Sequence, residues 1–431
     1  AYWMSELLRT YGGEAEDGRI LGVPLVGDRI LDISDDLNIE RAAYDACVEA
    51  IVADCDRAIN ECNLPDVYGK NNPQSRVYGN TIKGHVSGAA AKAIKARVLL
   101  YAASPAFNRT GSQEKWQRAA NAAADAINAL GGINVAFASR DEYYFTQISN
   151  YDWNKYDVVM RAKILPTNSE LETEHFPPGM YGQAQLNVSQ NFVDAFPDKY
   201  GYPINESSVY NPNLPYAERD PRLTQFVGYD GSAMGSYVLQ IAGNGPDAYD
   251  PLKRTSRSGY YLKKTLRPTL NLRPGHATTT PRANIIIGLP ELFLSFAEAA
   301  NEAWGPDGAD AGFSAKEALR KILLRGNADG ARYMDEQIGS DSGRFRDYVR
   351  LQRRLELSFE GHYYYDLRRW YAADDDWQSK INTTVYGVEI SEDNGYKRIE
   401  LEKRRFVSPY PPIPYTEVFN APAIVQNKGW N

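Results

Sequence analysis

The stretch ELSFEGHYYYDLRRW, residues 356–370, decides how the rest of the chain is interpreted. Its carboxylates, histidine, tyrosines and arginines could serve acid–base catalysis, or they could hold a helix against its neighbours. On a helix, residues three or four positions apart share a face. That spacing lines up an aromatic face made of Phe359, Tyr363, Asp366 or Leu367, and Trp370. Such a face predicts a helix that buries aromatic side chains.

The charged residues of the same stretch favour ion pairing over catalysis. Glu356 and Glu360 are four residues apart and would lie on a common side of a helix. The arginines around them are Arg353, Arg354, Arg368 and Arg369. A glycosidase needs two carboxylates that face each other across a cleft, roughly 5 Å apart in a retaining enzyme. Adjacent helical turns place them side by side instead, so we expect ion pairs within and between helices.

Outward from this stretch, helical patterns recur in pairs. Residues 85–108 show a pattern rich in small residues that ends at Ser104-Pro105, and residues 115–132 follow it and end at two glycines. The other segments with helical patterns are 1–13 with 39–62, 289–308 with 314–326, and 344–371. Paired helices predict packing like that of tetratricopeptide repeats, although the consensus signature of that repeat is absent.

Two regions differ from the helical pattern. Residues 133–284 are rich in Tyr, Gly, Pro and Asn and contain short possible strands such as residues 259–266. The last residues, 405–431, hold too many prolines for a helix or a central strand, so we expect them to wrap the surface. The fold class predicted is mainly α, a helical-repeat scaffold with a loop-rich, partly β insertion.

The predicted organisation is a single domain over residues 1–431. Within it we expect helical pairs, then a loop-rich insertion that forms the ligand face, then further helical pairs and an irregular C-terminal wrap. The boundaries are 1–132, 133–284, 285–372 and 373–431 respectively. Loop-rich insertions on a regular scaffold commonly carry function.

Composition excludes several classes of protein. Hydrophobic residues make up 43% of the chain and charged residues 24%, values typical of a globular protein. The net charge of −7 argues against nucleic acid as a partner, because phosphate binding needs a basic surface. Four scattered histidines give no metal-binding pattern, so we expect neither a metal nor a cofactor.

The cysteines and the apolar segments argue against a disulfide framework and against a membrane-spanning helix. Cys47 and Cys55 would lie about 12 Å apart on one helix, beyond the reach of a disulfide, and Cys62 follows them. No apolar run reaches the roughly 18 residues of a membrane span, and no signal peptide is visible. The opening AYWMSELLRTYGG starts directly in an amphipathic pattern, as if upstream sequence had been removed.

Several motifs together resemble the SusD/RagB family of outer-membrane nutrient-binding lipoproteins. LQRRLELSFEGHYYYDLRRW, at residues 351–370, looks like the last helical repeat of that family. The other matches are AYWMSELLRTYGG, AKAIKARVLLYAASPAFN, RDPRL at 219–223, LPELFLSFAEAANEA and PPIPYTEVFNAPAIVQNKGW. They occur in the order of the family and cover nearly the whole chain.

The resemblance implies a helical scaffold and a cell-surface, lipid-anchored location in the outer membrane. It also implies a partner, a SusC-like TonB-dependent transporter, to which the protein delivers glycans or, in some members, peptides. The lipid-bearing cysteine, the signal and the first helices of the family are absent from this chain, so membrane attachment would come only from an anchor outside it. The expected activity is binding without catalysis, with no catalytic residue.

An aromatic and polar stretch inside the insertion suggests where a glycan would bind. The apolar C–H face of a sugar suits an aromatic ring, and its hydroxyls need polar partners. SNYDWNKYD, residues 149–157, places Tyr151, Trp153 and Tyr156 beside Asn154. We predict these four residues as ligand-binding. Further candidates are Tyr181, Tyr229 and Tyr249.

Each of these interpretations has an alternative. Trp153 could instead anchor its loop to the scaffold. Peptide binding would use backbone donors and acceptors rather than aromatic platforms. A glycoside hydrolase would find its best carboxylates in AADDDWQ, residues 372–378, although such charge runs are usually solvated loops. A pure interaction protein would show a large exposed apolar patch.

Overall fold

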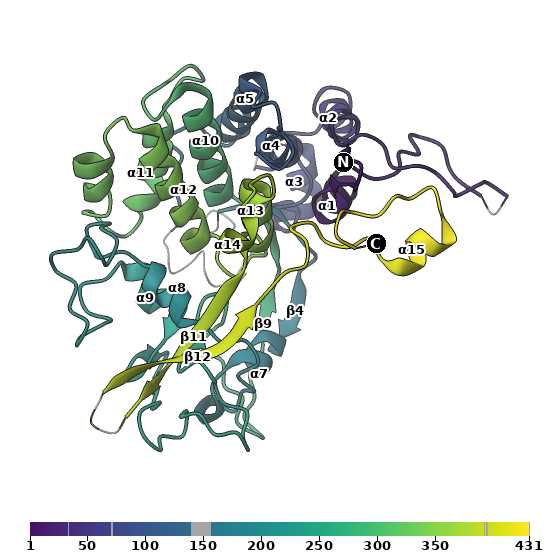
Figure 1. Cartoon of the computed structure of the whole chain (residues 1–431). Coiled ribbons are helices and arrows are strands. Elements are labelled where there is room, and N and C mark those ends of the chain that lie inside the picture. Colours follow the sequence, from purple (N-terminus) through teal and green to yellow (C-terminus); the bar gives the residue numbers. More distant parts are fainter. Residues whose placement is uncertain (33, 70–71, 139–156, 392, 394, 431) are drawn as a thin grey trace.

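The computed structural model describes residues 1–32, 34–69, 72–138, 157–391, 393 and 395–430. Figure 1 shows helices stacked side by side in one half of the molecule, and strands, short helices and loops in the other. The predicted fold class is therefore confirmed: the chain is mainly α, with a loop-rich and partly β portion.

The longer helices build the first half. They are α1 (Tyr2–Tyr11), α2 (Tyr44–Asn60), α4 (Gly88–Ala103), α5 (Gln113–Ala129), α10 (Leu289–Trp304), α11 (Ala315–Leu323), α12 (Ser342–Glu356) and α13 (Tyr363–Tyr371). Helix α4 packs against α2 and α5, and α10 packs against α4, α5, α11 and α12. Nearly every residue of α4 and α10 is buried, and the many alanines among them let neighbouring helices approach closely. These two helices are the centre of the main core.

Local sequence signals begin and end these helices. Ser87 begins α4, because its hydroxyl accepts a hydrogen bond from the Ala90 N–H at 3.2 Å. Ser314 and Glu317 form a reciprocal capping box at the start of α11. Helix α4 ends at Ala103, next to the predicted stop at Ser104-Pro105.

The single helix predicted over residues 344–371 is wrong, because the chain forms two helices with a turn between them. The buried Lys264 ammonium accounts for the break. It donates hydrogen bonds to the backbone carbonyls of Glu356, at 2.7 Å, and Ser358, at 2.8 Å. A continuing helix would need those carbonyls for its own hydrogen bonds. Phe359 then adopts a φ of 63°, and α13 begins four residues later.

The second half contains short elements around a smaller core. Its short helices are α7 (Glu170–His175), α8 (Gln190–Ala195) and α9 (Pro221–Phe226), and α3 (Pro73–Tyr78) lies apart from them. Its strands are β3 (Val158–Arg161), β4 (Leu165–Asn168), β5 (Val227–Gly228), β6 (Ala233–Met234), β7 (Tyr237–Val238), β8 (Tyr261–Leu262), β9 (Thr280–Arg282) and β10 (Ile285–Gly288). The antiparallel pairs are β3–β10, β4–β9, β5–β8 and β6–β7. Phe176, Phe196, Phe226 and Tyr261 are central to this core.

The region after residue 372 is more regular than expected. It contains α14 (Trp377–Ile381), the hairpin of β11 (Thr383–Ile390) and β12 (Tyr396–Arg404), and α15 (Tyr415–Asn420). The hairpin pairs Thr383 with Arg404 at its base and packs against α8. The prediction of an irregular segment missed this hairpin, in which Gly387, Val388 and Ile390 of β11 are buried.

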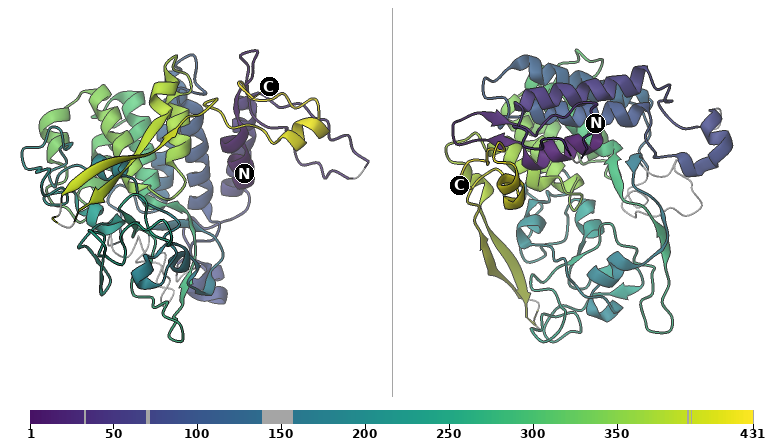
Figure 2. Two further views of the ribbon diagram at one scale, coloured as in Figure 1. Left: turned by 60° about the horizontal axis from the view of Figure 1, so that its bottom comes forward. Right: turned by 90° about the vertical axis from the view of Figure 1, so that its right-hand side faces the viewer.

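The proline-rich tail runs over the outside of the helical half. The Asn427 side-chain amide donates hydrogen bonds to the carbonyls of Tyr11, at 3.0 Å, and Pro411, at 2.8 Å. Asn427 also bridges to Ala15, which follows strand β1 (Gly13–Glu14) of the small β1–β2 (Ile20–Leu21) sheet. Figure 2 shows both chain ends on this side of the molecule.

The cysteines, the apolar helices and the possible metal ligands were also subjects of prediction. All three cysteines are free thiols, as expected. Within the ranges that the structure describes, no helix combines the length and the apolarity needed to cross a bilayer. The described residues contain no cluster of His, Cys, Asp and Glu that could hold a metal ion.

Candidate functional site

Residues 356–370 contribute to a buried network of charges. Asp366 and Arg369 are each 1% exposed, with a distance of 2.8 Å between carboxylate oxygen and Nε. Arg369 also binds both carboxylate oxygens of Glu298 on α10, at 2.6 and 2.7 Å. Burial would raise the pKa of Asp366, but Arg353 and Arg369 outweigh it and lower the pKa to about 2. The predicted ion pairs are therefore found for Arg353 and Arg369, whereas no carboxylate of the described chain pairs with Arg354 or Arg368.

The two glutamates of the stretch are also structural. Glu356 is fully buried, and its carboxylate lies 3.1 Å from a guanidinium nitrogen of Arg222. Glu360 lies beyond the end of α12, not one helical turn further along it, and its carboxylate accepts a hydrogen bond from Lys264 at 2.7 Å. These carboxylates connect the helical half to the loop-rich half. Glu356 is closed off from solvent, and the Glu360 side chain, which is 22% exposed, is held by Lys264.

The predicted aromatic residues are only partly described. Tyr151, Trp153, Asn154 and Tyr156 lie outside the described residues, so their role stays a prediction. The other three candidates are in the loop-rich half, and no ring contact or hydrogen bond among Tyr181, Tyr229 and Tyr249 is found in the described chain.

Those three tyrosines have different environments. Tyr181 and Tyr249 are each 55% exposed, and Tyr181 adopts a φ of 65° after a short 3₁₀ turn. Tyr229 is half-buried and stacks on Tyr216, with ring centroids 4.0 Å apart and planes 19° apart. Tyr181 and Tyr249 are thus exposed, whereas Tyr229 packs against another aromatic ring.

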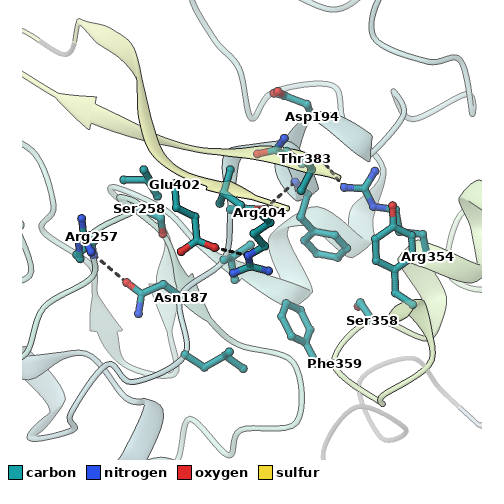
Figure 3. A pocket seen from close by; sticks show the side chains of 18 of the residues that line it. Asn187, Asp194, Arg257, Ser258, Arg354, Ser358, Phe359, Thr383, Glu402 and Arg404 are labelled. Carbon is teal, nitrogen blue, oxygen red and sulfur yellow. Dashed lines mark hydrogen bonds and ion pairs between the residues drawn. The ribbon is translucent and has the colours of Figure 1, made fainter. Parts of the chain in front are cut away.

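A large cavity lies elsewhere, where the β11–β12 hairpin meets α8 and the turn between α12 and α13. Its volume is about 1040 Å³. Figure 3 shows side chains from its lining, which come from α8 and the loop before it, from residues 255–258, from that turn and from the hairpin. This volume lies just above the range of roughly 300–1,000 Å³ that is typical of small-molecule sites.

One wall of the cavity is aromatic. Phe359, in the turn, is 36% exposed and packs edge-on against Phe192 of α8, with centroids 5.4 Å apart. Tyr363, at the start of α13, also lines the wall. A φ above zero is a strained conformation for a bulky residue, and such strain is concentrated at functional sites. The Lys264 contacts described above hold Phe359 in this position.

Two asparagines fix the frame around that wall. The Asn187 amide accepts a hydrogen bond from the Arg257 N–H at 2.8 Å and donates one to the Ala184 carbonyl at 2.7 Å. The Asn191 amide joins α8 to β11, because it donates to the Thr384 carbonyl at 3.0 Å and accepts from the Tyr386 N–H at 2.8 Å. These amides position the cavity walls relative to one another.

The charged lining of the cavity is mostly basic. Its basic residues are Arg257, Arg354, Lys380, Arg398 and Arg404, and its acidic residues are Asp194 and Glu402. Arg398 pairs with Asp194 at 2.6 Å, and Arg404 pairs with Glu402. Lys380 pairs with Asp374 and Asp376, which lie outside the lining.

The sequence patterns did not predict this cavity. Its residues come from four separate segments, 184–194, 255–258, 354–367 and 379–404, and no short motif joins them. The sequence signal for the hairpin was Tyr386, Val388 and Ile390 at every second position, a spacing that is typical of a strand. Phe359 and Tyr363 were singled out, but for an aromatic face on one continuous helix. No sequence pattern indicated that a turn would bring Phe359 to a cavity.

Comparisons with known proteins agree on one family. The model described as "SusD family" matches residues 141–430. A SusD-like protein from Bacteroides fragilis has 21% sequence identity and a TM-score of 0.73, and the match covers 100% of this chain and 78% of that one. A search of curated proteins found no match.

Two further solved structures are similar over nearly the whole chain. A SusD-like carbohydrate binding protein from Bacteroides fragilis has 19% identity and a TM-score of 0.71, with 98% of this chain and 77% of that chain covered. Surface glycan-binding protein A from Bacteroides uniformis has 15% identity and a TM-score of 0.59, with 99% and 75% covered. At these identities the likeness shows the fold that the chains share.

Proposed function

The chain belongs to the SusD family, and on this basis we propose that it binds an oligosaccharide at the cell surface and delivers it to a SusC-like TonB-dependent transporter. The observation that carries the proposal is the cavity beside Phe359, in which an aromatic wall faces a rim of polar and charged side chains. Two of the similar structures are described as carbohydrate- or glycan-binding, which supports the same class of ligand.

The chemistry of the cavity suits a sugar. The C–H face of a pyranose ring is apolar and slightly positive, so it is attracted to the negative face of an aromatic ring such as that of Phe359. The hydroxyl groups around the ring then need hydrogen-bond partners. Ser258, Ser379 and Thr383 contribute hydroxyl groups to the lining, and Gln185 contributes an amide. The large volume favours an oligosaccharide over a single small molecule.

The proposal assigns no catalytic step to the cavity. A glycoside hydrolase acts through a pair of free carboxyl groups, one of which must be able to donate a proton. The two carboxylates of the cavity lining, Asp194 and Glu402, are each paired with an arginine. The run Asp374–Asp376 lies just before α14, and two of its members pair with Lys380. Binding without hydrolysis is the function that fits these contacts.

The earlier aromatic candidates remain part of the proposal as a second contact region. Tyr151, Trp153, Asn154 and Tyr156 would extend the ligand face, and Tyr181, Tyr229 and Tyr249 are further candidates. We expect Trp153→Ala to weaken glycan binding without lowering the thermal stability of the protein. Equal affinity of the variant and the parent would remove Trp153 from the site.

The transporter and the lipid anchor are the other half of the proposal, and family membership supports them. Exposed aromatic residues on the C-terminal tail and on α1 would suit a protein contact. Trp3 and Tyr415 are each 77% exposed, and Phe419 is 69% exposed. Tyr415 and Phe419 stack on each other on α15, with centroids 5.9 Å apart. Copurification of the lipid-anchored protein with its transporter from outer membranes, reduced by Tyr415→Ala with Phe419→Ala, would support this contact.

The experiment that tests ligand binding is affinity gel electrophoresis of the purified chain with soluble polysaccharides, followed by calorimetry with polysaccharides and peptides. We expect one glycan to retard the protein and Phe359→Ala to abolish that retardation. Binding of peptides alone would replace the proposal with the peptide-binding function. Release of reducing ends from a bound glycan would overturn the assignment of a non-catalytic role.

A further inference from the structure

We infer that the ligand of this cavity is an acidic glycan, one that carries carboxylate or sulfate groups and is held by Arg354 and Arg257. The inference rests on the proposed function and narrows its class of substrate. It starts from the contrast between the cavity and the whole molecule. The chain as a whole has a net charge of −7, yet five basic and only two acidic side chains line the cavity.

Most of these basic side chains already have a carboxylate partner. The pairs Arg398–Asp194, Arg404–Glu402 and Lys380 with Asp374 and Asp376 account for three of the five. Arg257 and Arg354 are different, because no carboxylate in the described part of the chain pairs with either guanidinium. The positive charge of the cavity that has no carboxylate partner in the described chain is therefore located at Arg257 and Arg354.

Arg354 is held in place by contacts that do not neutralise it. One Nη donates a hydrogen bond to the Asn191 carbonyl at 3.0 Å. Its guanidinium carbon lies 5.0 Å from the centroid of the Tyr363 ring. A guanidinium has five N–H donors, and a single carbonyl leaves most of them available to an oxyanion. The side chain is half-buried, so its charge is partly desolvated without a counter-charge.

Arg257 supplies the second charge from another wall. Its backbone N–H is fixed by Asn187, while its side chain is exposed. In Figure 3, Arg257 and Arg354 stand at opposite ends of the cavity, and Phe359 lies between them. A glycan chain whose sugar ring stacks on Phe359 would carry acidic groups toward both ends. This arrangement favours a polymer with repeated acidic residues over a ligand with a single charge.

The test compares polymers of similar backbone that differ in charge. We would titrate polygalacturonate against its methyl-esterified form, and dextran sulfate against dextran, by calorimetry. We expect the acidic member of one pair to bind at least tenfold more tightly than its neutral counterpart, and the pair that responds identifies carboxylate or sulfate. Added NaCl should weaken that binding, since screening acts on charge–charge attraction.

Substitutions assign the effect to the two arginines. Arg354→Gln should lower affinity for the acidic polymer by about tenfold or more, as expected for loss of a charged hydrogen bond. Arg257→Gln should lower it as well, and this exposed residue can be changed without disturbing the fold. The matched control is Arg273→Gln, an exposed arginine outside the cavity, which should leave affinity unchanged.

Each other outcome counts against a specific claim. Equal binding of acidic and neutral polymers, with no loss in either arginine variant, would overturn the charge inference and leave glycan binding standing. Binding of no polysaccharide by the folded protein, judged by an intact thermal transition, would overturn the proposed function together with the inference. Binding of acidic polymers that both arginine variants retain in full would move the charged site away from this cavity.

Discussion

The buried charge network and the cavity use the same residue types in opposite ways. In the network, Arg369 lies 2.6 Å from a carboxylate oxygen of Glu298 and 2.8 Å from one of Asp366, with almost no exposure to solvent. In the cavity, Arg354 contacts a carbonyl and an aromatic ring. A buried guanidinium needs either a counter-charge, as Arg369 has, or several acceptors, as Arg41 has in four backbone carbonyls. Arg354 is half-buried with one carbonyl and no carboxylate of the described chain, so it is available to a ligand.

The largest expected effect comes from breaking the network. Glu298→Ala removes the carboxylate that binds Arg369 and accepts a hydrogen bond from the Trp370 indole N–H at 2.7 Å. Loss of one partner strands a buried charge, so the free energy of unfolding should fall by about 3–5 kcal/mol. Chemical denaturation measures it, with the exposed Arg332→Ala as control. A small loss for Glu298→Ala, equal to that of the control, would contradict a structural role of the network.

Acid should destabilise the scaffold through the buried imidazole of His362. Burial lowers the pKa of His362 from 6.5 to about 4, so the folded chain keeps this imidazole neutral. Between pH 6.5 and pH 4 the unfolded chain binds more protons, and stability therefore falls as the pH falls through this window. The full shift corresponds to about 3 kcal/mol.

Unfolding curves across that pH range would measure the effect of His362. The variant His362→Gln should show a flatter dependence, whereas His276→Gln, in an exposed loop, should follow the parent. A parent-like slope in His362→Gln would assign the acid sensitivity to other groups.

An intermediate effect is expected where the network and the cavity meet. Lys264→Met removes the ammonium that binds the carbonyls of Glu356 and Ser358 and the carboxylate of Glu360. The free energy of unfolding should fall by about 2 kcal/mol, because buried acceptors lose their donor. Affinity for the ligand should fall too, since the turn that holds Phe359 would relax. The exposed Lys253→Met is the control, and a loss of stability with unchanged affinity would uncouple the turn from the site.

The smallest effect on stability, with a clear effect on binding, is expected at Phe359. Glycine adopts a φ of 63° without strain, which should raise the free energy of unfolding by roughly 1–2 kcal/mol. The lost ring contact with Phe192 should lower it by about 0.5–1.5 kcal/mol. Phe359→Gly should therefore change stability by less than about 1 kcal/mol and lower glycan affinity about tenfold. Phe359→Tyr keeps the ring and should bind like the parent. Full affinity of the glycine variant would remove the aromatic wall from the site.

The helices were predictable wherever nearby residues in the sequence determine where a helix begins and ends. The pattern ending at Ser104-Pro105 gave the end of α4 within one residue, because small apolar residues repeat at helical spacing and the proline stops the helix. The turn between α12 and α13 was not predictable in this way. It depends on Lys264, about ninety residues earlier, whose ammonium takes the carbonyls of the last helical turn.

The site was harder to predict than the scaffold. Tyr181 and Tyr249 were chosen for their residue type, yet neither lines the large cavity. Arg354 was grouped with the ion-pairing arginines, and only the folded structure shows that no carboxylate of the described chain meets it. Charges along a sequence do not reveal which partners folding will supply. The segments that line the cavity, 184–194, 255–258, 354–367 and 379–404, become neighbours only when the two halves pack together.

The contact between the C-terminal tail and the N-terminal segment has a consequence for how the protein is made. Asn427 holds the end of α1 through the Tyr11 carbonyl, across 416 positions of sequence. A chain that emerges from its N-terminus cannot complete this contact until Asn427 has been synthesised. Contacts of such long range are formed slowly, since loop closure must precede them. Helix α1 therefore reaches its final packing only after Asn427 has joined it.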